Sequence, residues 1–302
     1  STDYRNGLAK GKVFDKIIAK DRKTTAQQRK RYRYTGGKRV RSIAKLMQDW
    51  QFTEPDGKTT LVALPHTWNA KDGQDGGNDY WRGTCTYSTT FAAPAFDAAS
   101  QEVWLQFEGV NSSAKVLLNG RNICTHDGGY STFRVHVSDL LAKDNQLTVE
   151  VDNSINDRVY PQKADFTFYG GIYREAELIL TERTAISPLY LGSDGVLVHP
   201  QTVGPEKVEG EIEVHITSKG DNSCTLNVDI TSPRGERVFS KRQKARLDGK
   251  PVSVAFSVDN PTLWSLRDPA LYTVTASIGE DSITDRVAVR TGFRSIGASP
   301  AE

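Results

Sequence analysis

Alternation between apolar and polar residues dominates the chain beyond Trp50. In each run, apolar side chains occupy every second position, as in strands of an antiparallel sheet that bury one face. The runs cover residues 102–109, 146–152, 211–217, 224–230, 252–258 and 271–278. In the first run we expect Val103, Leu105 and Phe107 to share the buried face.

Turn-forming sequences separate these runs. Asn119-Gly120, Asp127-Gly128-Gly129 and Asp248-Gly249 combine residues that adopt positive φ at low cost. Many short strands at even spacing, with no helical pattern between them, predict all-β sandwiches and exclude a parallel α/β sheet.

The start of the chain has a different pattern. The spacing of Val40, Ile43, Leu46 and Met47 predicts one or two helical turns before Trp50. Residues 1–37 carry little periodicity apart from a short patch of Val13, Phe14, Ile17 and Ile18. We therefore expect residues 1–45 to form an N-terminal extension, either partly helical or without regular structure.

A domain boundary is expected near Arg183–Pro188, where a strand-like run ends and a stretch with Gly and Pro begins. Residues 46–183 would then form one sandwich and residues 184–302 a second. The second segment has about the length of an immunoglobulin-like sandwich, ~100 residues.

Charge is divided unevenly along the 302 residues, whose net formal charge is +2. Residues 1–45 hold 15 Lys/Arg and three Asp, a local charge of +12, so the remainder carries −10. A basic arm is typical of tails that bind nucleic acid or a membrane surface, and more often of a solvated leader segment before the first domain. Because no nucleic-acid-binding fold follows, we expect no nucleic-acid partner. No apolar run approaches the ~20 residues of a transmembrane helix, so no membrane span is expected.

Familiar catalytic and metal-binding motifs are missing. Three widely spaced cysteines indicate neither a zinc site nor a disulfide framework. Asp72, Asp75 and Asp79 are placed either to ligate a hard cation or to form a solvated turn. No carboxylate pair for glycoside hydrolysis can be nominated, so we assign no catalytic residue and no metal ligand.

Residues 64–91 and 160–174 concentrate aromatic, amide and acidic side chains. Ring faces pack against sugar C–H groups, while amides and carboxylates bind sugar hydroxyls. The same rings also suit the core of a sandwich or a domain interface, and both interpretations stay open here.

Short motifs in a fixed order make the chain resemble the N-terminal region of glycoside hydrolase family 2, the β-galactosidase, β-glucuronidase and β-mannosidase family. The motifs are Asp49-Trp50-Gln51-Phe52, Leu64-Pro65-His66-Thr67-Trp68, Tyr80-Trp81-Arg82-Gly83, Phe107-Glu108-Gly109-Val110, Leu118-Asn119-Gly120, His126-Asp127-Gly128-Gly129-Tyr130, Gly170-Gly171-Ile172-Tyr173-Arg174, Asn260-Pro261-Thr262-Leu263-Trp264-Ser265 and Gly292-Phe293-Arg294-Ser295-Ile296. The resemblance covers about residues 46–297.

This resemblance implies a galactose-binding-like jelly-roll sandwich followed by an immunoglobulin-like sandwich. In the family a catalytic (β/α)₈ barrel follows and supplies two glutamates in a retaining mechanism. A barrel needs ~200–250 residues, so we expect the chain to be an inactive piece of a larger hydrolase, the parent being a retaining β-galactosidase. We expect no required cofactor, with at most a bound Ca²⁺ or Na⁺ ion.

The resemblance also nominates substrate-binding residues on the rim of the barrel's pocket. In β-galactosidases of the family, an aspartate six residues before the Gly-Ile-aromatic-Arg motif contacts the sugar. Asp165 stands six residues before Gly171 and matches it. Asn78 and Asp79 are further candidates, and an interdomain hydrogen-bonding role is the alternative for Asp165.

Two other functions are carried as alternatives. The first sandwich could act as a stand-alone carbohydrate-binding module through Trp68, Tyr80 or Trp81. The two sandwiches could instead form an extracellular interaction protein. For the main interpretation we expect a carbohydrate partner, reached through the parent enzyme, and a catalytic barrel in cis. A periplasmic or secreted location in a bacterium is expected, and the oligomeric state is left open.

Overall fold

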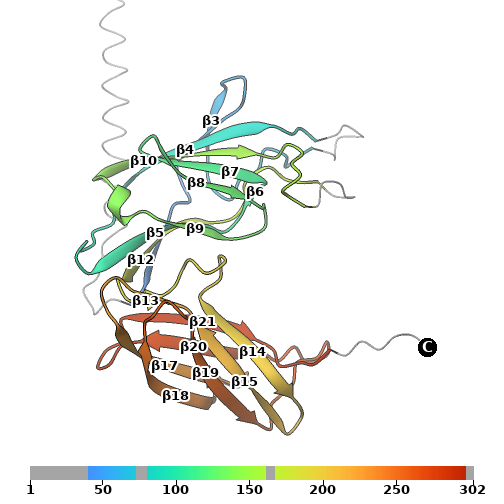
Figure 1. Ribbon diagram of the computed structural model, residues 1–302. Helices are drawn as coiled ribbons and strands as arrows, with labels where there is room; N and C mark the ends of the chain where they lie inside the picture. The colour runs from blue at the N-terminus through green and yellow to red at the C-terminus, as the bar shows by residue number, and fades with distance from the viewer. Residues whose placement is uncertain (1–39, 73–79, 161–166, 297–302) are drawn as a thin grey trace, which may run out of the picture.

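The computed structural model describes residues 40–72, 80–160 and 167–296. These residues form two β-sandwiches, drawn one above the other in Figure 1. Apart from one short 3₁₀ turn, η1 (Ser138–Leu140), every regular element among them is a strand. The all-β prediction, with a jelly-roll sandwich followed by an immunoglobulin-like one, is confirmed. Within the described ranges no helix is long and apolar enough to cross a membrane.

The first sandwich packs a six-stranded sheet on a four-stranded sheet. The larger sheet has the order β3-β2-β4-β10-β7-β8 and the smaller one β1-β12-β5-β9. Their strands are β3 (Thr59–Val62), β2 (Trp50–Thr53), β4 (Thr84–Ala92), β10 (Asp144–Asp152), β7 (Ser113–Leu118), β8 (Arg121–Asp127), β1 (Ser42–Lys45), β12 (Ala176–Glu182), β5 (Gln101–Phe107) and β9 (Phe133–His136). A two-stranded ladder joins β11 (Gly171–Ile172) to β6 (Val110–Asn111).

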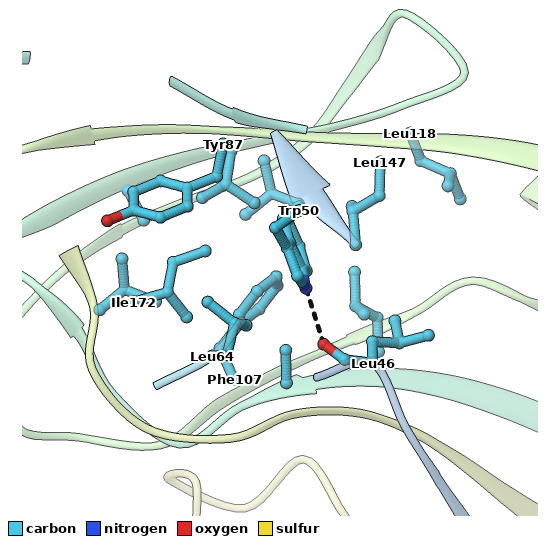
Figure 2. Close-up of a cluster of buried hydrophobic side chains, with 14 of the residues drawn as sticks. Leu46, Trp50, Leu64, Tyr87, Phe107, Leu118, Leu147 and Ile172 are labelled. Carbon is cyan, nitrogen blue, oxygen red and sulfur yellow. Dashed lines mark hydrogen bonds between the residues drawn. The ribbon is translucent and has the colours of Figure 1, made fainter. Parts of the chain in front are cut away.

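A large aromatic core fills the space between these two sheets (Figure 2). Trp50, Tyr87 and Phe107 are fully buried in it. The Trp50 indole Nε1 donates a 2.8 Å hydrogen bond to the Leu46 carbonyl, so its only polar group is satisfied inside the core.

The second sandwich packs the sheet β14-β15-β19 on the sheet β18-β17-β20-β21. Its strands are β14 (Val196–Val203), β15 (Lys207–Val214), β19 (Val252–Asp259), β18 (Arg237–Arg246), β17 (Ser223–Thr231), β20 (Tyr272–Ile278) and β21 (Asp285–Thr291). A short ladder of β13 (Ala185–Ile186) with β16 (Ile216–Thr217) closes the end nearest the first sandwich.

The helical turns expected around Val40–Met47 are wrong where the structure can be compared. Ser42–Lys45 forms β1, which pairs with β12 from Ser42↔Leu180 to Lys45↔Glu177. Pairing with an existing sheet overrides the weak local preference for a helix. The first sandwich therefore begins before residue 46 and includes residues 42–45 of the predicted extension. Residues 1–39 lie outside the described ranges.

The strand over residues 102–109 is also more buried than its alternation suggested. All seven residues of β5 are buried, including Glu102 and Gln106 on the face away from the core. This second face meets the other sandwich: Lys219 Nζ lies 2.8 Å from Glu102 Oε1, and the Arg134 guanidinium reaches both Gln106 and the Pro188 carbonyl. Polar residues at alternate positions thus form the contact between the sandwiches.

Candidate functional site

The two aromatic-rich segments of the sequence meet at one end of the first sandwich. The Tyr80 and Phe168 rings lie 6.3 Å apart, and the Arg82 guanidinium lies over both, 4.7 and 5.3 Å from their centroids. On the other side, the Trp68 ring lies against Gly170, where a Cβ would stand only 2.1 Å from Trp68 Cζ2. Glycine at position 170 is therefore what lets the two segments approach this closely.

A fully buried amide, Asn69, fastens this contact. Its Nδ2 donates to Asp72 Oδ2 at 2.6 Å and to the Trp81 carbonyl at 2.8 Å. Its Oδ1 accepts from the Gly170 backbone N–H at 2.8 Å. One side chain thus joins positions 72, 81 and 170, and such a satisfied buried network is costly to break.

A second buried amide, Asn153, extends the network from the end of β10. Its Nδ2 donates to Asn69 Oδ1 at 3.1 Å and to the Phe168 carbonyl at 3.4 Å, while its Oδ1 accepts from the Gly83 N–H at 2.9 Å. The two amides together hold the backbone at positions 81, 83, 168 and 170. We call this end of the first sandwich the loop end.

Aromatic rings line a hollow of about 730 Å³ beside this network. Trp68 stacks on Phe52 at 6.0 Å and meets Trp81 edge-on at 5.9 Å. The Trp68 Nε1 is buried and has no hydrogen-bond partner among the described residues. Trp81 is 43% exposed, so its ring is available to a ligand in the hollow.

His66 lines this hollow, and its ring contacts the fully buried Tyr87 in the core behind it. The His66 Nδ1 lies 2.7 Å from the Tyr87 hydroxyl, and burial lowers the pKa of His66. Burial raises the pKa of Tyr87, so its hydroxyl stays protonated at neutral pH. Gly171, at φ 132°, is required here because a Cβ would stand 2.4 Å from the His66 carbonyl oxygen.

A second hollow, of about 410 Å³, lies around the exposed aromatic rings of the same end. Its lining includes Tyr130, Tyr169 and Tyr173, together with Asn111, whose Nδ2 donates to the Tyr169 carbonyl at 2.8 Å. Tyr130 is 49% exposed and the nearby Tyr160 is 79% exposed. These rings offer flat apolar faces with polar edges, the surface that sugars and protein partners both use.

We assign no acid/nucleophile pair for hydrolysis to the described residues that line the two hollows, because neighbouring groups hold the carboxylates of the larger hollow. Asp72 is held by Asn69 and by the Trp81 N–H at 3.0 Å. Glu54 and Asp56 stabilise the turn in which they lie. Glu54 pairs with the Lys58 ammonium, and Asp56 accepts a hydrogen bond from the Lys58 backbone N–H.

A group of three carboxylates, Glu108, Glu175 and Glu177, lies elsewhere on the first sandwich, within 4.8 Å of one another. Burial, with the adjoining Glu175, raises the pKa of Glu177 to about 7. Lys45 lowers the pKa of Glu175 through a 2.5 Å contact. A shared proton and this lysine account for the close approach of the carboxylates, so we assign no metal to them.

Of the residues nominated from sequence, Asp165, Asn78 and Asp79 lie outside the described residues. Trp68, Tyr80 and Trp81 are brought together as described above. Of the three aspartates considered for a cation, Asp72 is engaged by the amide network, and Asp75 and Asp79 lie outside the described residues.

Sequence reasoning missed the two amides that organise this end. Asn69 closes the Leu-Pro-His-Thr-Trp-Asn motif, and Asn153 directly follows the alternating run 146–152. The available signals were an amide beside aromatic residues at position 69 and an amide directly after a strand at position 153. Nothing in the pattern, however, showed that positions 69, 153 and 170 meet in space.

Comparisons with known proteins agree with this architecture. Residues 73–178 match the family model described as "Glycosyl hydrolase 2 galactose-binding domain-like", and residues 196–294 match "Glycosyl hydrolases family 2". A β-glucuronidase of Bacteroides fragilis is 32% identical over 262 residues, which is 81% of this chain and 37% of the relative. A β-galactosidase of Thermoanaerobacterium thermosulfurigenes is 27% identical over 202 residues, 64% of this chain and 27% of the relative.

Among solved structures, the FMN-binding β-glucuronidase of Facaelibacterium prausnitzii superposes with a TM-score of 0.76 at 35% identity. The match covers 84% of this chain and 39% of that structure. The chain therefore spans well under half the length of these relatives. The two successive family models and these structural matches show that the chain belongs to glycoside hydrolase family 2, as a galactose-binding-like domain followed by an immunoglobulin-like domain.

Proposed function

We propose that this chain is the non-catalytic part of a retaining β-glycosidase, and that the loop end of its first sandwich forms one side of the sugar pocket. The catalytic barrel, acting in cis, would supply the two glutamates. The observation that carries the proposal is the buried Asn69 amide, which holds an exposed ring, Trp81, and the Gly170 backbone at one end of the sandwich. Such a rigid, aromatic, amide-bearing rim suits sugar binding.

The substrate class has two candidates. The residues of the Leu-Pro-His-Thr-Trp and Tyr-Trp-Arg-Gly motifs favour a β-galactoside, and the T. thermosulfurigenes relative is named a β-galactosidase. The more similar relatives from B. fragilis and F. prausnitzii are named β-glucuronidases, which supports a β-glucuronide. Hydrolysis of aryl β-galactoside and aryl β-glucuronide by the complete protein separates the two.

Asp165, Asn78 and Asp79 are proposed to contact the sugar from this rim. The ring contact between Tyr80 and Phe168 supports a shared role for Asp79 and Asp165. Asp79 directly precedes Tyr80 in the sequence, and Asp165 lies three positions before Phe168. Carboxylates and amides there would accept and donate hydrogen bonds to sugar hydroxyls.

Kinetics of the complete protein test this assignment. We expect Asp165→Asn to lower kcat/KM by at least about tenfold, the loss of one charge-assisted hydrogen bond to substrate. Asp248→Asn, on an exposed turn of the second sandwich, is the matched control and should leave it unchanged. Equal kinetics for the two variants would overturn the role of Asp165.

A retaining hydrolysis by two carboxyl groups requires no cofactor. We therefore expect dialysis against EDTA to leave the rate unchanged, and a lost rate that Ca²⁺ restores would show a required ion. A periplasmic or secreted location is part of the same proposal, and fractionation of the source cells tests it.

Stand-alone sugar binding is the second candidate function, favoured by the exposure of Trp81 beside the hollow. Titration calorimetry of the chain with methyl β-galactoside and methyl β-glucuronide should then show binding that Trp81→Ala abolishes. A flat response at millimolar sugar excludes this function. Membership of family 2 counts against the third alternative, an interaction protein made only of sandwiches.

A further inference from the structure

The outer face of the sheet β18-β17-β20-β21 in the second sandwich is strongly basic. On β17 and β20, Leu226, Val228, Val274 and Ala276 point into the core. Because side chains alternate along a strand, the residues between them point to the opposite face, away from the sheet β14-β15-β19. The sheet can be followed in Figure 1 by its four labels.

Strand register arranges this outer face into rows. One row reads Arg242, Asn227, Ser277, Arg286 across the four strands, and another reads Arg237, Thr231, Thr273, Arg290. The row between them reads Ser240, Asp229, Thr275, Ala288. Arginines therefore stand on the two edge strands, and hydroxyl and amide side chains, with the single carboxylate of Asp229, form the floor between them.

The four arginines have a regular spacing. Three strand separations of ~4.8 Å put the edge strands ~14 Å apart. Arg286 and Arg290 are four residues apart on β21, which is ~13 Å of strand. All four arginines are exposed, while the floor residues Asn227, Thr273 and Thr275 are half-buried between them. The four arginines thus stand at the corners of a rectangle, and the hydrogen-bonding side chains of the floor lie inside it.

The charge of this face is not balanced locally. Lys244 and Arg246 on β18 add to the four arginines, against the single carboxylate of Asp229, which lies 3.9 Å from Arg237 Nη1. The bordering turns carry Glu236, Glu280 and Asp281, and the Arg242 guanidinium donates to the Glu280 carbonyl at 3.0 Å.

Overall the second sandwich is nearly neutral, since residues 184–296 hold 13 Lys/Arg and 14 Asp/Glu. The acids gather on the other sheet, where β15 carries Glu209, Glu211 and Glu213. Protection of sheet edges against pairing needs charge of either sign on an edge strand. It does not account for cations concentrated on one face of both edge strands of the same sheet.

We propose that this face docks a carboxylated polysaccharide, a polymer of uronic acid residues. A guanidinium fork matches a planar carboxylate, and the Thr, Ser and Asn floor matches sugar hydroxyls. The register rows carry no aromatic side chain, so the face offers no platform for the bases of single-stranded nucleic acid. This inference does not depend on the proposed function, since it uses none of the residues at the loop end.

Binding of polygalacturonate to the 302-residue chain tests the proposal, at about 0.1 M salt so that charges beyond ~10 Å are screened. The variant replaces Arg237, Arg242, Arg286 and Arg290 by Gln. The control replaces four exposed cations elsewhere, Lys58, Arg121, Lys143 and Lys250, by Gln. Both variants keep the basic residues 1–45, so any binding by that arm is common to them.

We expect the sheet variant to raise Kd by at least about tenfold and the control by less than about twofold, as distant screened charges contribute little. Fully methyl-esterified polygalacturonate, which lacks the charge, should not bind. Equal losses in the two variants, or unchanged binding in the sheet variant, would overturn the proposal. Heparin or single-stranded DNA binding as tightly, with the same loss in the sheet variant, would overturn the commitment to carboxylated sugars.

Thermal unfolding midpoints check that both variants are folded. If the four-residue variant unfolds at a lower temperature than the control, the pair Arg242→Gln and Arg286→Gln replaces it, since these two arginines bound a single row of the sheet. The pair is expected to raise Kd by about threefold or more, with the pair Lys58→Gln and Arg121→Gln as its control, and no difference between the pairs contradicts docking on this face.

Discussion

Arg41 and Asp285, 244 positions apart in the chain, form a bidentate ion pair that joins the two sandwiches. Arg41 Nε lies 3.1 Å from Asp285 Oδ1 and Nη2 lies 2.9 Å from Oδ2. The same carboxylate accepts from the Ile186 N–H at 2.8 Å, and Arg41 donates to the Ile186 carbonyl. The residue just before β1 thus anchors the first strand of one sandwich to the interior of the other.

Replacing Arg41 by Met should destabilise the chain by about 3–5 kcal/mol, because the fully buried Asp285 carboxylate would lose its ionic partner. Urea unfolding measures the loss. Lys115→Met is the matched control, since Lys115 and Glu150 pair on the surface, where an ion pair contributes at most about 1 kcal/mol. Equal losses in the free energy of unfolding for the two substitutions would show that the buried pair stabilises the chain no more than a surface pair does.

The buried carboxylate of Glu102 should make stability fall in acid. Burial alone would raise the pKa of Glu102, but hydrogen bonds from Lys219, Ser138 and His136 outweigh it and hold the pKa at about 2. A carboxyl whose pKa is lower in the folded state stabilises above its unfolded pKa. Its contribution, about 3 kcal/mol, is then lost as pH falls from about 4.5 towards 2.

Urea unfolding between pH 6 and pH 3 checks this for wild type and Glu102→Gln. The variant should be less stable at pH 6 and should show a shallower loss in acid. Glu150→Gln, at the exposed pair with Lys115, is the control and should follow the wild-type curve. Parallel curves for Glu102→Gln and wild type would contradict the assignment.

Glu177 should behave in the opposite way. Its folded-state pKa of about 7 exceeds the ordinary 4.5, so the buried carboxylate destabilises the fold as pH rises from about 4.5 through 7. Glu177→Gln keeps the oxygen that accepts from Gln106 Nε2. It should stabilise the chain at pH 8 by about 1–3 kcal/mol and change little at pH 4.5. A stabilisation of equal size at both pH values would point to packing instead.

Asn69→Ala should cost about 2–4 kcal/mol, because it leaves the Gly170 N–H, the Trp81 carbonyl and the Asn153 amide each short of a partner. Asn122→Ala, at an exposed position of β8, should cost less than about 0.5 kcal/mol. Denaturant unfolding with tryptophan fluorescence follows both variants. A loss no larger than that of Asn122→Ala would show that the amide does not hold the loop end together.

The strands of the second sandwich were predictable because each buries one face against a single partner sheet. The runs 224–230, 252–258 and 271–278 correspond to β17, β19 and β20 with only small differences at their ends. Asn119 and Gly120 both adopt positive φ, 53° and 79°, in the turn between β7 and β8. Local pattern and turn chemistry sufficed for these elements.

The hydrophobic pattern of the sequence could not predict contacts between segments that are distant in the chain. Ser42–Lys45 carries a helix-compatible spacing, yet β12 recruits it as an edge strand. Glu102 and Gln106 look solvent-facing in β5, and only the second sandwich explains why they are buried. The same holds at the loop end, where Asn69, Asn153 and Gly170 are distant in sequence and the hydrogen bonds that join them emerge only from the fold.

Rates of hydrolysis of aryl β-galactoside and aryl β-glucuronide test whether the two sandwiches need the proposed barrel for catalysis. The purified 302-residue chain is assayed beside a longer protein that includes the barrel we propose, and a variant of its proposed nucleophile controls for contaminating glycosidases. We expect the longer protein to hydrolyse one of the two substrates and the chain alone to hydrolyse neither. Turnover by the chain alone, above the rate of that control, would contradict this expectation.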